Sequence, residues 1–566
     1  MRRFSLIAAL ALATALTAPA LADEVPAPAP VAAPARAQAP AAAQPAPRLV
    51  LAIAVDQFSA DLFAQYRRHY TDGLKRLQEG AVFPSGYQSH AATETCPGHS
   101  TLLTGTHPAR NGIIANNWFD PGLARADKRV YCSEDLTDPA STSSNPVVSA
   151  SLLKVPTLGE WMKRANPASR NVAVSAKDRA VAMMGGHQLD TAYWWKGSSF
   201  VTFKGRELSP AAVAQNAAVA KVLKSGAPAL NPRPWCGAQD RAVAVGKSAV
   251  GTGRFRLEPG KADAFRISPR MDHATAELAI RLVDELKLGQ GAAPDLLSVS
   301  LSATDYIGHA VGNEGLEMCI QMAEVDVAIG KLLTHLDARG IDYAVVLTAD
   351  HGGLDAPERS NQQALPAAVR VDDALRPNEL AKAITARTGV TAAQGPLLYA
   401  DGASGDFYVS RSVSAPDKAR VIDALTMIAR AHPQVAAVYT NGELARMPVP
   451  TANPQDWSLV DRVRASFDPA RSGDVLILLD RAVTPIPEPM PGAYIATHGS
   501  AFDYDRRVPM LFWRKGLTPF EQGAPVATVD IAPTLAALVG IKAPAGTWDG
   551  RCLDLDGGAA DTCAVK

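Results

Sequence analysis

The stretch LVLAIAVD, residues 49–56, decides the fold of this chain, because an apolar run of strand length ends abruptly in a carboxylate. Seven consecutive apolar residues without polar alternation are typical of a strand that is buried on both faces. Similar runs lie at 171–176, 295–301, 343–348, 474–479 and 508–513, with helical patterns between them. The pattern predicts an α/β fold with a central, mainly parallel sheet sandwiched by helices.

Side chains that bind metals follow several of these predicted strands. In an open parallel sheet, ligands bind at the carboxyl ends of the strands, so residues far apart in the sequence are expected to meet there. Carboxylate and imidazole groups together favour Zn²⁺ or a similar divalent ion. With a late Thr-His-Gly, the chain offers enough ligands for two ions: Asp56, Asp305, His309, Asp350, His351 and His498.

Each of these residues also has a structural interpretation. An Asp that follows a strand is more often a helix N-cap or a turn former than a metal ligand. In Asp350-His351-Gly-Gly, the two glycines give a loop flexible enough for both side chains to face one ion. The joint pattern, rather than any single residue, carries the prediction.

The segment ATETCPGHSTLLTG, residues 92–105, places a hydroxyl where the other segments have a carboxylate. Pro97 suits the first turn of a helix, so Thr95 is expected near a helix N-terminus, which attracts anions. A metal ion at Thr95 would make its hydroxyl a nucleophile. Two alternatives are that Thr95 is only an N-cap, and that Cys96 is a thiolate nucleophile with His99 as its partner.

Composition restricts the class of protein. The 566 residues carry 56 basic and 56 acidic side chains, so no global field favours nucleic acid or an anionic membrane, and neither partner is expected. Residues 1–22 have the pattern of a secretory signal peptide, and 23–47 are an Ala/Pro-rich linker. We therefore expect a periplasmic or secreted protein with no stable membrane anchor.

The strand-like runs suggest a division of the remaining chain. Residues 48–355 and 471–566 are expected to form one catalytic domain, and 356–470 an inserted α+β subdomain or cap, with a hairpin and a helix of its own. Trp194 and Trp195 either line a cleft or anchor an insertion. Six cysteines fit an oxidising compartment, and among fifteen possible pairings only Cys552 with Cys563 is suggested by closeness in the sequence.

Five motifs in this order resemble the alkaline phosphatase superfamily, in its nucleotide pyrophosphatase/phosphodiesterase-like branch. They are Asp56, Thr95-x-Pro-Gly-His, Asp305-x-x-x-His309, Asp350-His351-Gly and Thr497-His498-Gly. The resemblance implies two zinc ions, one held by Asp56, Thr95, Asp350 and His351, the other by Asp305, His309 and His498. It also implies Thr95 as the nucleophile and a phosphothreonine intermediate.

Three further residues resemble the phosphate-irrepressible bacterial alkaline phosphatases with a Thr nucleophile. Asn116 stands where the family has an Asn that donates to a phosphoryl oxygen, although Asn117 is an alternative, and Lys177 and Arg179 match a phosphate-binding pair. A monoester dianion has one more charge and one more free oxygen than a diester, which gives both cations a partner. The resemblance therefore implies hydrolysis of small-molecule phosphate monoesters.

Two other functions remain open from the sequence. A phosphodiesterase or nucleotide pyrophosphatase would use the same metal ligands, and a non-catalytic periplasmic zinc-binding protein would need neither Thr95 nor Asn116. Relative rates on a matched monoester and diester separate the first from a phosphatase. Stoichiometric zinc without any hydrolysis would indicate the second.

Overall fold

The computed structural model describes residues 44–490 and 492–564. The predicted signal peptide and most of the predicted linker therefore lie outside the described residues. In the parts of the chain that are described, no helix has the length and apolar character needed to cross a bilayer.

A large mixed sheet forms the centre of the fold, with the strand order β19-β2-β18-β11-β1-β10-β5-β6-β7 and β20 beside β2. Its middle strands β11, β1, β10, β5 and β6 are all parallel, as the apolar runs predict. The strands are β1 (Leu49–Val55), β2 (Ala81–Tyr87), β5 (Asn171–Ser175), β6 (Thr191–Lys196), β7 (Ser199–Val201), β10 (Asp295–Leu301), β11 (Tyr343–Thr348), β18 (Arg507–Arg514), β19 (Phe520–Glu521) and β20 (Val526–Ala527).

Two of the six predicted strands depart from a purely parallel sheet. The run at 508–513 is β18, which belongs to the central sheet but pairs antiparallel with both β11 and β2. The run at 474–479 is β16 (Val475–Leu479), which lies in a separate sheet. An apolar run reveals burial but neither strand direction nor the sheet to which a strand belongs, which explains both differences.

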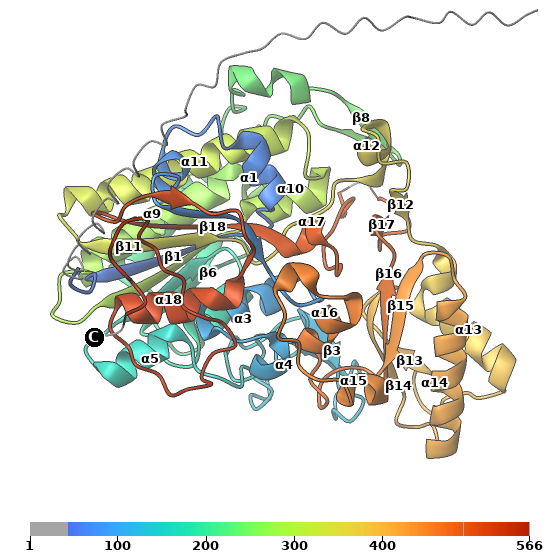
Figure 1. The fold of residues 1–566 in the computed structure, drawn as a ribbon. Helices are drawn as coiled ribbons and strands as arrows, with labels where there is room; N and C mark the ends of the chain where they lie inside the picture. Colours follow the sequence, from blue (N-terminus) through green and yellow to red (C-terminus); the bar gives the residue numbers. More distant parts are fainter. Residues whose placement is uncertain (1–43, 491, 565–566) are drawn as a thin grey trace, which may run out of the picture. The chain divides into compact units, whose positions relative to one another are not determined.

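Helices cover both faces of the central sheet, and successive residues of β1 show how. Leu49, Leu51 and Ile53 pack into the core formed with helices on one face, whereas Val50 and Ala52 pack into the core on the other. The first face carries α1 (Ala60–Tyr66), α9 (Pro269–Leu286) and α11 (Leu316–Ala338), and the second α3 (Thr95–Thr104), α5 (Leu158–Ala165) and α18 (Ile531–Leu538) (Figure 1). The predicted sandwich is confirmed.

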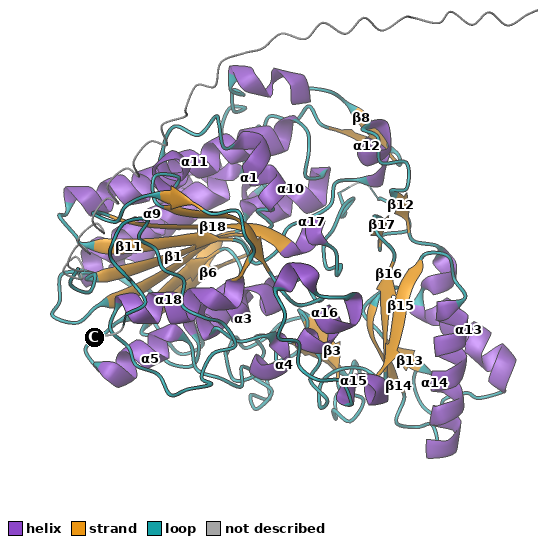
Figure 2. Ribbon diagram, in the orientation of Figure 1, coloured by secondary structure: helices purple, strands orange, loops and turns teal. Residues whose placement is uncertain are grey.

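A second, smaller sheet has the strand order β13-β14-β16-β15 and is antiparallel (Figure 2). Helices α13 (Pro377–Thr388) and α14 (Ala415–Arg430) pack against it around a core of its own that includes Phe407, Leu425 and Ile477. Its other strands are β13 (Leu398–Tyr399), β14 (Gly405–Val409) and β15 (Val435–Thr440). Most of this unit falls within the predicted insertion, and β16 supplies a strand from beyond residue 470.

Three disulfides join all six cysteines: Cys96–Cys132, Cys236–Cys319 and Cys552–Cys563. The last confirms the pairing expected from the sequence. Trp194 and Trp195 lie on β6 and are 5% and 7% exposed, packed against Phe203 and Phe265 respectively. Both indoles are core residues rather than cleft residues.

Candidate active site and metal centre

The predicted ligands follow three neighbouring strands of the central sheet. Val55 pairs with Leu301 and Ala54 with Thr348, so β1, β10 and β11 end at the same level. Asp56 directly follows β1, and Asp350 follows β11 after one residue. Asp305 lies in the first turn of α10 (Ala303–Val311), which begins after β10. The register therefore brings these carboxylates to one edge of the sheet.

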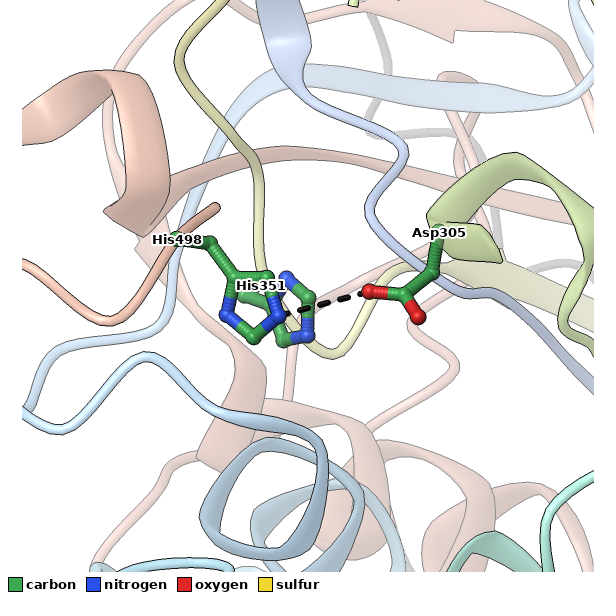
Figure 3. Close-up of side chains that lie close together, drawn as sticks. All are labelled: Asp305, His351 and His498. Carbon is green, nitrogen blue, oxygen red and sulfur yellow. Dashed lines mark ion pairs between the residues drawn. The ribbon is translucent and has the colours of Figure 1, made fainter. Parts of the chain in front are cut away.

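The structure gathers the predicted ligands into two overlapping groups. The ligand atoms of Asp56, Asp350 and His351 all lie within 4.8 Å of one another, and so do those of Asp305, His351 and His498. Figure 3 shows the second group, with the His498 imidazole directed at the Asp305 carboxylate. The Nε2 atoms of His309 and His498 each lie 3.3 Å from Asp305 Oδ1, so His309 also belongs to this cluster.

Backbone carbonyls orient three of the imidazoles. The Nδ1 atoms of His309, His351 and His498 lie 2.9, 2.8 and 2.8 Å from the carbonyl oxygens of Ala496, Gly352 and Thr93. A carbonyl only accepts, so each Nδ1 must carry the proton, and each Nε2 has a free lone pair. This arrangement is typical of metal-binding histidines.

The pKa values agree with neutral imidazoles. Burial lowers the pKa of His351 to about 3, and burial also lowers the pKa of His498. Burial raises the pKa of Asp350, but the imidazoles of His351 and His99 outweigh this effect and hold the carboxyl below its usual range. His351 and His498 are thus ready as uncharged nitrogen donors and Asp350 as a charged oxygen donor, whereas burial and the neighbouring Asp350 raise the pKa of Asp56.

Unpartnered buried atoms test whether a metal fits. Both oxygens of Asp56, Oδ1 of Asp305, Oδ2 of Asp350 and Nε2 of His351 are buried without a hydrogen-bond partner. Backbone amides of Gln57 and His351, each 3.1 Å away, hold only the other oxygen of Asp350. Buried polar atoms without partners are costly, and here they converge as oxygen and nitrogen donors. The donor set fits divalent zinc.

Thr95 is the first residue of α3 and is 1% exposed. Lys177 Nζ lies 3.2 Å and Arg179 Nη2 lies 3.5 Å from Thr95 Oγ1. Both cations come from the loop and helix that follow β5, since Lys177 precedes α6 (Asp178–Gly185). Two positive groups and a helix N-terminus therefore surround the hydroxyl, an arrangement that attracts an anion.

Lys177 links the hydroxyl to the carboxylates. Its ammonium lies 2.7 Å from Asp56 Oδ2 and 2.6 Å from Asp305 Oδ2, although the contact with Asp56 lacks the direction of a hydrogen bond. Burial lowers the pKa of Lys177, but the two carboxylates outweigh it and raise that pKa above its usual value. Lys177 therefore stays charged throughout the physiological pH range.

Gly98 allows α3 to approach the metal-ligand loop. A Cβ atom at this position would lie 2.0 Å from the backbone oxygen of Asp350. The next residue, His99, has its Nδ1 2.9 Å from Thr95 O and its Nε2 2.9 Å from Ser300 Oγ. Its Nδ1 also lies 3.0 Å from Asp350 Oδ2, a close approach without a hydrogen bond. The alternative of a Cys96 thiolate is excluded in this structure, because Cys96 is bonded to Cys132.

Asn116 rather than Asn117 lies beside Thr95 and the start of α3. Asn116 Oδ1 accepts a hydrogen bond from the amide of Cys96 at 2.8 Å, which leaves its Nδ2 group free to donate. Asn117 Nδ2 donates instead to Asp401 at 3.3 Å. Glu94, at the N-cap of α3, accepts a hydrogen bond from the backbone amide of Asn116 at 2.7 Å. Both the backbone and the side chain of Asn116 are therefore fixed to the start of α3.

A short hairpin supports these groups, although its two strands were not predicted. Strands β3 (Asn117–Phe119) and β4 (Arg129–Tyr131) pair so that Asn117 faces Tyr131. The Tyr131 hydroxyl donates to Asp178 at 2.6 Å and lies 3.5 Å from Arg179 Nη1. The Cys96–Cys132 disulfide fastens the same hairpin to α3. An acidic residue between the two predicted cations, Asp178, was the only available signal.

The site opens into a cavity of about 830 Å³. Asn116, Arg179, His309 and His498 line it, together with Tyr408 and Leu476 of the small sheet. A cavity beside convergent polar groups is where a small-molecule substrate binds.

Comparison with known proteins agrees with this geometry. The chain is 50% identical to the alkaline phosphatase PhoK of a Sphingomonas species, over 92% of this chain and 93% of PhoK. It is 49% identical to the alkaline phosphatase PhoD of Zymomonas mobilis, over 92% of this chain and 90% of PhoD.

The fold and the family are also shared with characterised proteins. The crystal structure of the wild-type alkaline phosphatase PafA superposes with a TM-score of 0.78 and 25% identity, covering 90% of this chain and 99% of PafA. The sequence model of the type I phosphodiesterase / nucleotide pyrophosphatase family matches residues 50–501. With its strand-end carboxylates, imidazoles and buried Thr95, this chain is therefore a hydrolytic enzyme of the type I phosphodiesterase / nucleotide pyrophosphatase family, within the alkaline phosphatase superfamily.

Proposed function

We propose that the chain is an exported, zinc-dependent alkaline phosphatase that hydrolyses phosphate monoesters through a phosphothreonine intermediate. One observation carries the proposal: Lys177 and Arg179 both reach Thr95 Oγ1, beside the two groups of candidate metal ligands. The names of the two relatives near 50% identity support it. The export is inferred from residues 1–22 and agrees with three disulfides.

We assign Asp56, Thr95, Asp350 and His351 to one zinc ion and Asp305, His309 and His498 to the other. Two zinc ions would supply Lewis acidity that lowers the pKa of a hydroxyl and stabilises a departing oxygen. The shared position of His351 in both clusters agrees with two adjacent ions. The three Nδ1–carbonyl hydrogen bonds hold the imidazoles in the tautomer that the assignment requires.

The side chains around Thr95 suit an in-line displacement at phosphorus. Thr95 Oγ gives up its proton to water and attacks the phosphorus atom, the bond to the ester oxygen breaks, and the leaving alkoxide takes a proton from water, so that one proton is released and one is taken up. Arg179, Lys177 and the Asn116 amide donate to the non-bridging oxygens, whose charge is spread in the transition state. Water then attacks the phosphothreonine, releases inorganic phosphate and restores the Thr95 hydroxyl.

The decisive experiment replaces the nucleophile. Thr95→Ala should remove turnover of 4-nitrophenyl phosphate, and Thr95→Ser should retain part of it, because a hydroxyl remains. Acid quenching of the wild-type enzyme with a ³²P-labelled monoester should trap label on the peptide that contains Thr95. Undiminished turnover by Thr95→Ala would refute the assignment.

A phosphodiesterase is the second candidate, because the matched family is named for that activity. It would use the same metal ligands, but a diester presents one fewer free oxygen to Lys177 and Arg179. Comparison of kcat/KM for 4-nitrophenyl phosphate with that for its methyl diester decides between the two. A higher value for the diester would replace our proposal.

We also propose that residues 356–470, together with β16, form a subdomain that restricts entry to the site. The support is that Asp401, Tyr408 and Leu476 line the same cavity as Arg179. Removing charge at an exposed position of this wall, as in Asp401→Asn, should alter KM more than kcat.

A further inference from the structure

The cavity beside Thr95 is larger than a phosphoryl group requires. Its volume is about 830 Å³, and of the residues proposed to bind the phosphoryl group only Asn116 and Arg179 are among the described residues that line it. Under the proposed function, the rest of this space holds the leaving group of the ester. Its walls therefore decide which monoesters are accepted.

Tyr494 is the aromatic residue nearest the candidate metal ligands. Its ring stacks on the imidazole of His309, with 4.0 Å between centroids and 8° between planes. The neighbouring backbone is fixed to the same histidine, since the amide of Ile495 donates to His309 O at 2.8 Å and His309 Nδ1 donates to Ala496 O at 2.9 Å. The ring is nevertheless 51% exposed. One face of Tyr494 is thus covered by His309, and the ring lines the cavity.

The remaining walls are largely apolar. Aromatic and aliphatic side chains from the hairpin, the small sheet and the loop before Tyr494 contribute to them: Phe119, Tyr408, Leu476, Leu478, Ile486 and Met490. Met490 is 64% exposed, which is unusual for a large apolar residue unless a ligand covers it. Flat apolar groups stack favourably on aromatic rings such as Tyr494.

The charges of the cavity beyond the phosphoryl site are negative. Five acidic side chains line it: Glu94, Asp401, Asp406, Glu488 and Asp505. Burial raises the pKa of Asp406 to about 6 and the pKa values of Glu94 and Asp505 to about 7, so these three are fully charged only in alkaline solution. Arg179 is the one Lys or Arg among the described residues that line the cavity, and under the proposed function it binds the phosphoryl group. Away from the phosphoryl end, a second anionic group on the substrate would therefore meet repulsion, because the nearby Arg129 is paired with Asp401 at 2.7 Å and does not line the cavity.

We propose that this cavity is a leaving-group subsite built around Tyr494, which accepts monoesters of uncharged aromatic or apolar alcohols and discriminates against leaving groups that carry a further negative charge. The inference rests on the proposed phosphatase activity and adds the class of substrate to it.

A matched pair of substrates tests the charge discrimination in the wild-type zinc enzyme. We compare 3-carboxyphenyl phosphate with its methyl ester, which differ by one negative charge and little in shape. The acid should have a kcat/KM about tenfold lower, the effect of one like-charge repulsion near a protein surface. The difference should shrink in 1 M NaCl, because salt screens exposed charges. Equal kcat/KM values for the two esters would overturn the inference.

Two substitutions test the role of Tyr494. Tyr494→Phe keeps the ring and should keep the preference for phenyl phosphate over 2-hydroxyethyl phosphate, whereas Tyr494→Leu should reduce that preference by about fivefold to tenfold, as expected for one lost aromatic contact. Damage to His309 is recognised separately, because it would also lower the zinc content and raise the inhibition constant of inorganic phosphate. An unchanged preference in Tyr494→Leu, with normal zinc content, would overturn the inference.

The proposed phosphatase function and the proposed subsite are overturned by different results. If the zinc-loaded enzyme hydrolyses no monoester, the proposed function falls and this inference falls with it. If it hydrolyses the acid and the methyl ester equally well, the phosphatase function stands and only the subsite is wrong.

Discussion

Replacement of Arg179 by Ala isolates the group that should distinguish a monoester from a diester. The guanidinium lies 3.5 Å from Thr95 Oγ1, and its Nε atom is buried without a hydrogen-bond partner. It is therefore placed to donate to a phosphoryl oxygen. Lys177 is a less specific probe, because its removal also leaves Asp56 and Asp305 as buried carboxylates without a cation.

The expected magnitude follows from the kind of interaction lost. A hydrogen bond between charged groups contributes about 1.5–3 kcal/mol, which corresponds to a decrease in kcat/KM of about 10- to 150-fold. The loss should apply to 4-nitrophenyl phosphate. Methyl 4-nitrophenyl phosphate has the same leaving group but one fewer charged oxygen, so its kcat/KM should fall less than about tenfold.

Arg266→Ala provides the matched control. The Arg266 guanidinium lies 4.5 Å from the centroid of the Tyr306 ring, and Lys177 Nζ lies 5.2 Å from the same centroid, yet Arg266 makes no contact with Thr95 among the interactions of the described residues. It should leave the ratio of the two esters unchanged. An equal decrease for both esters in Arg179→Ala, with normal thermal unfolding, would refute the electrostatic reasoning.

Three further predictions concern the support of the site. Loss of the Cys96–Cys132 disulfide through a double Ala substitution should lower kcat/KM for the monoester by about tenfold or more, because a catalytic group misplaced by 1 Å costs up to about 100-fold in rate. Double Ala substitution of Cys236 and Cys319 should not lower kcat/KM in this way. Gly98→Ala should lower bound zinc, measured by metal analysis, because its Cβ would overlap Asp350 O, whereas Gly237→Ala has nothing within 4 Å and should bind normally. Burial raises the pKa of Asp549, but hydrogen bonds from His107 outweigh this effect and lower the pKa to about 2. The carboxylate therefore stabilises the folded state at pH values above its unfolded pKa of 3.8, and this stabilisation is lost as the pH falls through 2. Asp549→Asn should therefore lower the free energy of unfolding by about 2 kcal/mol at pH 7 and little at pH 2, measured by urea unfolding in EDTA, and an equal loss at both pH values would contradict the assignment.

The parallel strands that are followed by candidate metal ligands are the part of the fold that could best be predicted from the sequence. In β1, β10 and β11, an uninterrupted apolar run followed by Asp specifies both burial and a position at one sheet edge. The run VLILL of β16 is equally apolar but belongs to the small sheet, where helices cover it. Either sheet can bury such a run. Apolarity therefore could not assign it.

The supporting groups were less predictable than the candidate ligands. Glu94, Tyr131 and Tyr494 act on neighbours that are distant in sequence or through the backbone, and no residue spacing encodes such contacts. The choice between Asn116 and Asn117 likewise depended on which side chain contacts the first turn of α3 and which contacts Asp401. Only the three-dimensional register decides that.

The strand order of the central sheet has a consequence for how the protein is made. Strand β1 is separated in the sequence by hundreds of residues from both of its neighbours, β10 and β11, and His498 follows the last strand of the small sheet. During synthesis the chain emerges with Thr95 and Lys177 long before the last candidate ligand exists. A truncated or nascent chain that lacks His498 cannot complete both ligand groups. The candidate metal centre can therefore assemble only after almost the whole chain has been synthesised.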